Sequence, residues 1–215
     1  MSHSNLQNKQ TLFEIAASQY GLFTAKQAIK AGFKKNNHPY HVQVGNWVRE
    51  WHGIYRLARF PPHQDSELAL WTLWSCNSNG EPQAVYSHET ALQIFDVSDI
   101  MPAKLHLTVS KGFRKQASQC LVLHRCDMPK QDIEFRDEFR VTKPLRTLFD
   151  LIITNSVSRD ILRQALFEFL QRGLIMQQQI KNLKDKRQIK STAPQISKLL
   201  ELLKEIGHTE NGKNL

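Results

Sequence analysis

The fold is decided by residues 47–57, which read WVREWHGIYRL. Aromatic and β-branched residues fill both ends of this stretch, and such residues favour extended strands. Two residues, His52 and Gly53, separate the runs, which is the length of a tight hairpin loop in which glycine supplies a positive φ. The stretch therefore predicts a β-hairpin with strands at 47–51 and 54–57.

Two helices are expected well ahead of this hairpin. From residue 11 to residue 20 the apolar residues recur at helical spacing, and Gly21 is suited to end the helix in a left-handed conformation. Thr24, with Gln27 three residues later, has the spacing of a capping box, which predicts a second helix that ends at Gly32.

A third helix, short and polar, is expected between residue 37 or 38 and residue 45. Pro39 suits its first turn and Gly45 suits its exit. Three short helices followed by a hairpin form a winged helix-turn-helix, so we expect that fold over residues 1–62. Residues 60–62, Phe-Pro-Pro, continue neither a helix nor a central strand, and they mark its boundary.

The rest of the chain alternates between strand and helix patterns. Strands are expected over 104–109, 120–124, 133–135 and 139–141, and helices are expected to begin near Asp65, Ser87, Thr142 and Ser158. We therefore expect a mixed α/β domain over residues 63–180. Residues 181–215 read as a basic tail, charged and mobile over 181–190, with a terminal amphipathic helix through 196–206. The expected fold class is α+β.

The positive charge of the chain is concentrated at its two ends. Net charge is +9 and the sequence pI is about 9.6. Residues 1–64 carry eight Lys or Arg against two Asp or Glu, residues 65–180 carry thirteen against fourteen, and residues 181–215 carry eight against four. A basic module joined to a neutral domain is typical of proteins that bind nucleic acid.

The third helix and the hairpin contain the side chains that a protein needs to read duplex DNA. Amide side chains pair with adenine edges, and cationic and hydroxyl groups bind phosphates. The candidate DNA-binding residues are Lys34, Lys35, Asn36, Asn37, His38, Tyr40, His41, Gln43, Arg49, His52 and Arg56. The alternative is that residues 34–37 form an ordinary solvated turn. Trp47, Tyr55 and Leu57 are expected to pack in the core of the hairpin.

The N-terminus and the cysteines indicate the compartment. The N-terminus is polar, with neither a secretory signal nor a membrane span, so we expect a cytoplasmic protein without membrane association. Cys76, Cys120 and Cys126 form no CxxC pair, and their odd number argues against a disulfide framework. Buried thiols are expected instead.

Neither a catalytic nor a metal or cofactor site is expected. Ser87, His88 and Glu89 are sequence neighbours that point in different directions, and Ser87 as N-cap with Glu89 in the first turn explains them. Histidines and cysteines at 106, 120, 124 and 126 lack metal-ligand spacing, so core or edge positions are expected for them.

Several segments of the chain resemble one known family in their order. The segments are GLFT (21–24), HPYHV (38–42), WVRE (47–50), GIYRL (53–57), SHETAL (87–92), LHLTV (105–109) and VTKPLRTLFDL (141–151). Together they resemble AbiEi-type antitoxins of bacterial type IV toxin-antitoxin systems, over about residues 10–175.

The resemblance implies a two-part protein. The winged helix would bind an operator upstream of its own operon and repress it, and the C-terminal domain would oppose a nucleotidyltransferase-like toxin. Some relatives append a nuclease domain, for which about forty residues past Gly173 are too few. We therefore expect no enzyme. The alternatives are a solitary winged-helix regulator, or a protein-interaction module without a toxin partner.

Overall fold

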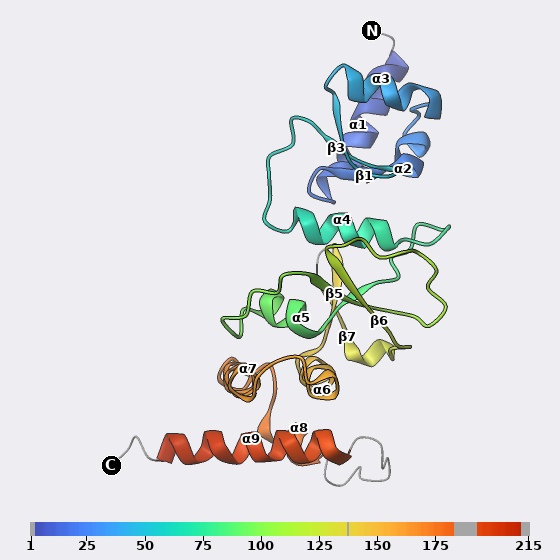
Figure 1. The fold of residues 1–215 in the computed structure, drawn as a ribbon. Helices are drawn as coiled ribbons and strands as arrows, with labels where there is room; N and C mark the ends of the chain where they lie inside the picture. Colours follow the sequence, from blue (N-terminus) through green and yellow to red (C-terminus); the bar gives the residue numbers. More distant parts are fainter. Residues whose placement is uncertain (1–2, 137, 183–192, 212–215) are drawn as a thin grey trace. The chain divides into compact units, whose positions relative to one another are not determined.

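The computed structural model describes residues 3–136, 138–182 and 193–211. The chain is a mixed α/β protein with two sheets and with helices at its N-terminus (Figure 1). It divides into two compact units: an N-terminal unit of residues 1–84 with 135–139, and a C-terminal unit of residues 85–134 with 140–215.

In the N-terminal unit, helices surround a small antiparallel sheet. The helices are α1 (His3–Ala17), α2 (Ala25–Lys30), α3 (His38–Gln43) and α4 (Ser66–Ser75), and a 3-10 turn (Lys35–Asn37) leads into α3. The strands are β1 (Leu22–Thr24), β2 (Trp47–Trp51) and β3 (Ile54–Leu57), in the order β1-β3-β2. The expected hairpin is confirmed residue for residue. Strand β1 was not expected, and α1 begins earlier than the apolar pattern indicated.

Local signals in the sequence explain where α1 and α2 meet the sheet. The capping box is confirmed: the Gln27 N–H donates to Thr24 Oγ1 at 3.2 Å, and the Thr24 N–H donates to Gln27 Oε1 at 2.7 Å. Gly21 has φ +83°, and a Cβ there would lie 2.5 Å from the Phe60 ring. A glycine is therefore required between α1 and β1 for both its backbone angle and its small size.

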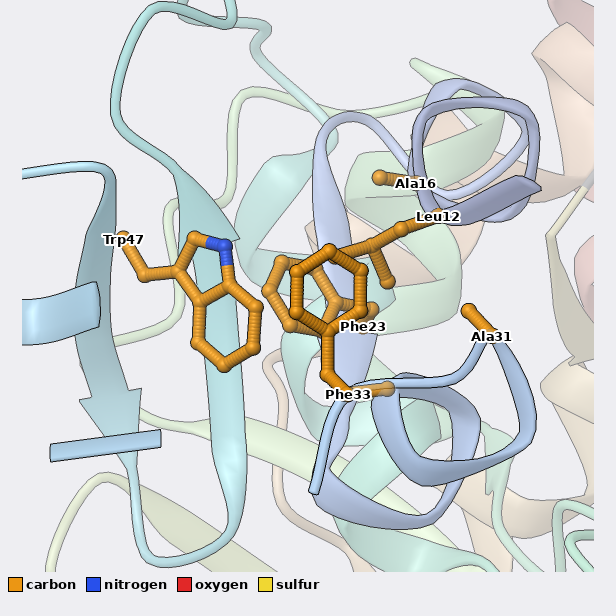
Figure 2. Close-up of a cluster of buried hydrophobic side chains, with 7 residues drawn as sticks. Leu12, Ala16, Phe23, Ala31, Phe33 and Trp47 are labelled. Carbon is orange, nitrogen blue, oxygen red and sulfur yellow. The ribbon is translucent and has the colours of Figure 1, made fainter. Parts of the chain in front are cut away.

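Aromatic rings fill the core of the N-terminal unit. Figure 2 shows Phe23, Phe33 and Trp47 beside the small side chains of α1 and the segment after α2. The Phe23 side chain is fully buried, and its ring centroid lies 4.9 Å from that of Trp47, edge to face. The Trp47 ring also contacts Phe33 after α2 and His41 of α3, so it ties these helical segments to the sheet.

The second sheet is five-stranded, and most of its residues belong to the C-terminal unit. Its strands are β4 (Val85–Tyr86), β5 (Leu105–Val109), β6 (Leu121–Arg125), β7 (Ile133–Arg136) and β8 (Phe139–Thr142), in the order β6-β5-β4-β8-β7. Strand β5 pairs parallel with β6 and antiparallel with β4, and β4 pairs parallel with β8. The four longer strands match the expected segments to within one or two residues.

Helices pack on this sheet and on one another. They are α5 (His88–Phe95), α6 (Pro144–Thr154), α7 (Arg159–Gln171), α8 (Gln177–Asn182) and α9 (Ala193–Asn211), and a 3-10 turn covers Lys130–Asp132. Helix α5 contacts β5, α6 contacts α5 and α7, and α9 contacts α6, α7 and α8 (Figure 1). The terminal amphipathic helix is confirmed, since Leu199 and Leu202 of α9 are fully buried. Helix α8 was not expected.

The hydroxyl of Ser87 does not cap α5 as expected. Ser87 stands at the N-cap position of α5 but makes no capping hydrogen bond, so the capping prediction for its side chain is wrong. Its hydroxyl is bonded instead to His88 and Thr108. The predicted mobile segment of the tail falls mostly on residues 183–192, which lie outside the described residues.

Of the helices that the structure describes, none is both long enough and apolar enough to cross a membrane.

Removal of the Phe23 ring should destabilise the N-terminal unit. Phe23→Ala leaves a cavity beside Trp47, and truncation of a buried Phe costs about 3–5 kcal/mol. All four tryptophans of the chain lie in residues 47–74, so tryptophan fluorescence during urea unfolding reports on this unit. The matched control is Val48→Ala, because Val48 is 37% exposed on the same hairpin. Equal urea midpoints for the two variants would contradict the assigned core.

Candidate functional site

One side of α3 and the turn before it carries polar, exposed side chains. Asn36, Tyr40 and Gln43 are exposed. Tyr40 and Gln43 lie three residues apart on α3, which places them on the same side of the helix, and Asn36 lies in the 3-10 turn before it. Tyr40 is 60% exposed although it is aromatic. Lys34 and Lys35 are exposed at the start of this segment. The segment therefore presents amide, phenol and ammonium groups together.

The opposite side of α3 holds the helix to the core. His38 is 2% exposed, and its Nε2 lies 3.2 Å from the Phe33 carbonyl oxygen. Its ring packs edge to face against Trp47 and Tyr55. The expectation that His38 contacts DNA does not fit this position, because a ring enclosed by the core cannot reach a phosphate. His38 instead anchors α3.

His41 lies between these two sides. Its ring stacks on Trp47 with centroids 4.6 Å apart, and its Nδ1 lies 3.5 Å from Asn46 Nδ2. Burial lowers the pKa of His41 below 6.5, and the nearby His38 and Lys9 lower it further. At neutral pH the ring is therefore uncharged, and any contact that it makes with an anion is a hydrogen bond without a charge.

The hairpin carries a second group of polar side chains. Arg49 and His52 are exposed, and Arg49 Nη2 lies 3.2 Å from His52 Nδ1. Arg56 is half-buried and forms an ion pair with Glu50, with Nε and Oε1 2.6 Å apart. The Arg56 charge is thus compensated within the hairpin. Among the described residues, no ion pair involves Arg49, Lys34 or Lys35, so these cations face solvent.

The turn and α3 are attached at opposite ends of β2. Helix α3 packs against Trp47 at the start of the strand, whereas the Gly53 carbonyl in the turn accepts a hydrogen bond of 2.8 Å from the Ala25 N–H. Arg49, the third residue of β2, lies between these two ends.

Most of the expected DNA-binding residues are accessible. Eight are exposed: Lys34, Lys35, Asn36, Asn37, Tyr40, Gln43, Arg49 and His52. His41 and Arg56 are half-buried, and His38 is buried.

A cluster of three histidines lies in the C-terminal unit and was not expected from the sequence. His88, His106 and His124 each bring a ring nitrogen within 4.8 Å of the other two. His106 and His124 lie on neighbouring strands, where His124 pairs with Thr108 and so falls on the same face as His106. The two cysteines that were considered with them, Cys120 and Cys126, are not part of this cluster.

Burial keeps these histidines uncharged. It lowers the pKa of His88 to about 3, with the neighbouring His124, His106 and Arg146 adding to the effect. Burial also lowers the pKa of His124 to about 4, assisted by His106. The pKa of His106 is lowered by burial too, although the Glu89 carboxylate opposes that shift. At neutral pH the cluster therefore offers neutral imidazoles, which are hydrogen-bonding groups and metal ligands.

Comparisons with known proteins identify no family for this chain. No protein-family model matches the chain, and no curated protein matches it. Among solved structures, it is similar to the crystal structure of RV2827C protein from Mycobacterium tuberculosis, with a TM-score of 0.45 and 12% identity over 75% of this chain and 71% of that one. A likeness this distant supports no argument about fold or function.

The stability of the N-terminal unit should fall on mild acidification because of His41. The folded pKa is below 6.5, so the unfolded state binds more protons as the pH drops through 6.5, and the free energy of unfolding decreases. Urea midpoints from tryptophan fluorescence at about pH 7.5 and about pH 5.5 measure the effect. His41→Gln removes the titrating group, so its midpoint should change less. An equal change in both proteins would exclude this role for His41.

Proposed function

We propose that the N-terminal unit is a winged helix-turn-helix that binds double-stranded DNA. The order of its elements supports this proposal: a helix, a short strand, two helices and a hairpin, with the strands in one antiparallel sheet. In this arrangement α2 and α3 form the helix-turn-helix and the β2-β3 hairpin forms the wing.

The observation that carries the proposal is the exposed side of α3. A recognition helix needs one side bound to the core and one side lined with groups that hydrogen-bond to base edges. His38 meets the first need and Asn36 with Gln43 meets the second. Residues 34–37 are all exposed and include the 3-10 turn, so the alternative of an ordinary solvated turn stays open for them.

We assign the contacts by chemistry. The amides of Asn36 and Gln43 are suited to adenine edges in the major groove. Lys34 and Lys35, beside them, are suited to phosphates. Arg49 and His52 of the hairpin are suited to phosphates too and would meet the neighbouring backbone or minor groove. Arg56 makes a weaker contribution in this scheme, because Glu50 already compensates its charge.

We further propose that the chain is a transcriptional autorepressor and antitoxin without enzymatic activity. The resemblance to AbiEi-type antitoxins supports this proposal, and it extends into the C-terminal unit. The segments that resemble the family in this unit are 87–92 on α5 and its N-cap, 105–109 on β5, and 141–151 on β8 and α6. In this proposal the C-terminal unit opposes a nucleotidyltransferase-like toxin, and the N-terminal unit represses the shared operon.

Removal of two exposed cations should weaken DNA binding. Lys34→Ala with Arg49→Ala should lower affinity for the DNA upstream of the protein's own gene roughly tenfold or more, because two charge-assisted phosphate contacts are lost. The slope of log affinity against log salt should become shallower by about 1.8, at about 0.9 per contact. Fluorescence anisotropy of a labelled duplex over a salt series measures both quantities.

The matched control is Lys104→Ala with Lys130→Ala, which removes the same charge from exposed positions of the C-terminal unit. This variant should bind as the wild type does. If the two double variants lose affinity equally, binding depends on net charge and the assigned surface is wrong.

The antitoxin proposal makes a separate prediction about a protein partner. Co-expression with the product of the adjacent open reading frame should yield a complex on size-exclusion chromatography, and the chain should relieve growth inhibition by that product. Lys34→Ala with Arg49→Ala should keep both properties, since it leaves the C-terminal unit intact. A complex without any shift of the upstream DNA would favour an interaction module. DNA binding without a complex would favour a solitary regulator.

A further inference from the structure

The histidine cluster of the C-terminal unit has the composition of a metal site. His88 begins α5, His106 lies in β5 and His124 lies in β6, so three separate elements each supply one imidazole. His106 Nδ1 and His124 Nε2 are 3.1 Å apart. Two nitrogens that bind one tetrahedral zinc ion are separated by about 3.3 Å, because each Zn–N bond is about 2.0–2.1 Å long. This pair is thus already spaced for a shared ion.

Oxygen atoms hold the other ring nitrogens of two of these histidines. His106 Nε2 lies 3.4 Å from Glu89 Oε2, on the side of the ring away from His124. His88 Nδ1 lies 2.8 Å from Ser87 Oγ, which also accepts a hydrogen bond from Thr108 Oγ1. Histidines that bind metals usually donate their second ring N–H to such an oxygen, which fixes the tautomer.

The tautomers that follow leave one ring nitrogen of His88 and one of His106 unprotonated. A serine hydroxyl has two lone pairs, so Ser87 is able to accept from both Thr108 and the Nδ1–H of His88. His88 Nε2 is then unprotonated. In the same way, an Nε2–H of His106 that faces Glu89 leaves His106 Nδ1 unprotonated. Neutral imidazole with one bare nitrogen is the form that binds a metal.

The backbone at His88 is held in an unusual conformation. His88 has φ +54°, which is the left-handed region that residues with a Cβ seldom occupy. Such a conformation is unfavourable and persists where the surrounding structure requires it. Here it places the ring of the first residue of α5 against His124, with centroids 3.6 Å apart. The strain therefore brings the third imidazole to the other two.

We propose that His88, His106 and His124 bind one divalent transition-metal ion of the zinc class. Imidazole ligands select zinc, copper, nickel or iron over magnesium and calcium, which prefer oxygen. Glu89 orients His106 and offsets part of the charge of the ion. The rings of His88 and His124 are stacked, so binding requires the His88 ring to turn toward the shared centre. Three protein ligands leave the fourth position of a tetrahedral ion to water.

The proposal concerns a different unit from the DNA-binding surface and does not depend on it. Without a metal, the same residues would form a self-contained hydrogen-bonded group, in which His106 and His124 share one proton and Glu89 accepts another. The two states differ in whether the full chain takes up a stoichiometric metal ion, and in which variants abolish that uptake.

The test is a metal titration of the full chain after treatment with a chelator. Co²⁺ should bind at one equivalent per chain with the strong visible absorption of tetrahedral cobalt, and Zn²⁺ should displace it. Isothermal titration calorimetry should give the same stoichiometry for Zn²⁺. Glu89→Gln, which keeps all three imidazoles, should weaken Zn²⁺ binding about 10- to 100-fold, and His124→Gln should weaken it more than that.

The control is His63→Gln, because His63 is a half-exposed histidine of the N-terminal unit, and this variant should bind as the wild type does. Circular dichroism checks that each variant is folded. Absence of stoichiometric binding by the wild type overturns the proposal. Binding that is equally strong in wild type, Glu89→Gln and His124→Gln overturns it too, since the ion would then lie elsewhere. Neither result bears on the DNA-binding proposal, which is tested separately by measuring DNA binding of the wild type.

Discussion

The N-terminal unit depends on the packing of a single indole. The Trp47 ring contacts the rings of Phe23, Phe33, His38, His41 and Tyr55. These rings come from β1, the segment after α2, α3 and β3. Because one side chain meets all of them, it sets the rotation of α3 about its axis. The direction in which the polar side of α3 points is therefore a property of the aromatic core.

The parts of this fold that were predicted are those with local causes. The hairpin at residues 47–57 and the capping box at Thr24 and Gln27 depend on residues within a few positions of each other. Strand β1 was missed because its three residues have no periodicity of their own and become a strand by pairing with β3, about thirty positions away. Tertiary pairing outweighs local pattern where the element is this short.

The same distinction separates the predicted and missed parts of the candidate sites. Exposure of Asn36 and Gln43 followed from their polarity, whereas burial of His38 was decided by Trp47 and Tyr55, which no local pattern reveals. The histidine cluster was missed because its members are eighteen positions apart and on different elements. Ser87 shows both effects: its position as N-cap was predictable, but its hydroxyl is used by the tertiary partners Thr108 and His88.

The hydrogen bond between the Ala25 N–H and the Gly53 carbonyl has a consequence for recognition. A wing that swings loosely must lose conformational entropy when it settles on a duplex, and that loss is subtracted from the affinity. Here the tip of the hairpin is fastened to the start of α2 before any ligand arrives. In the proposed DNA-binding mode this surface is preorganised, which would favour DNA whose groove already has a matching width and disfavour DNA that must be reshaped to fit.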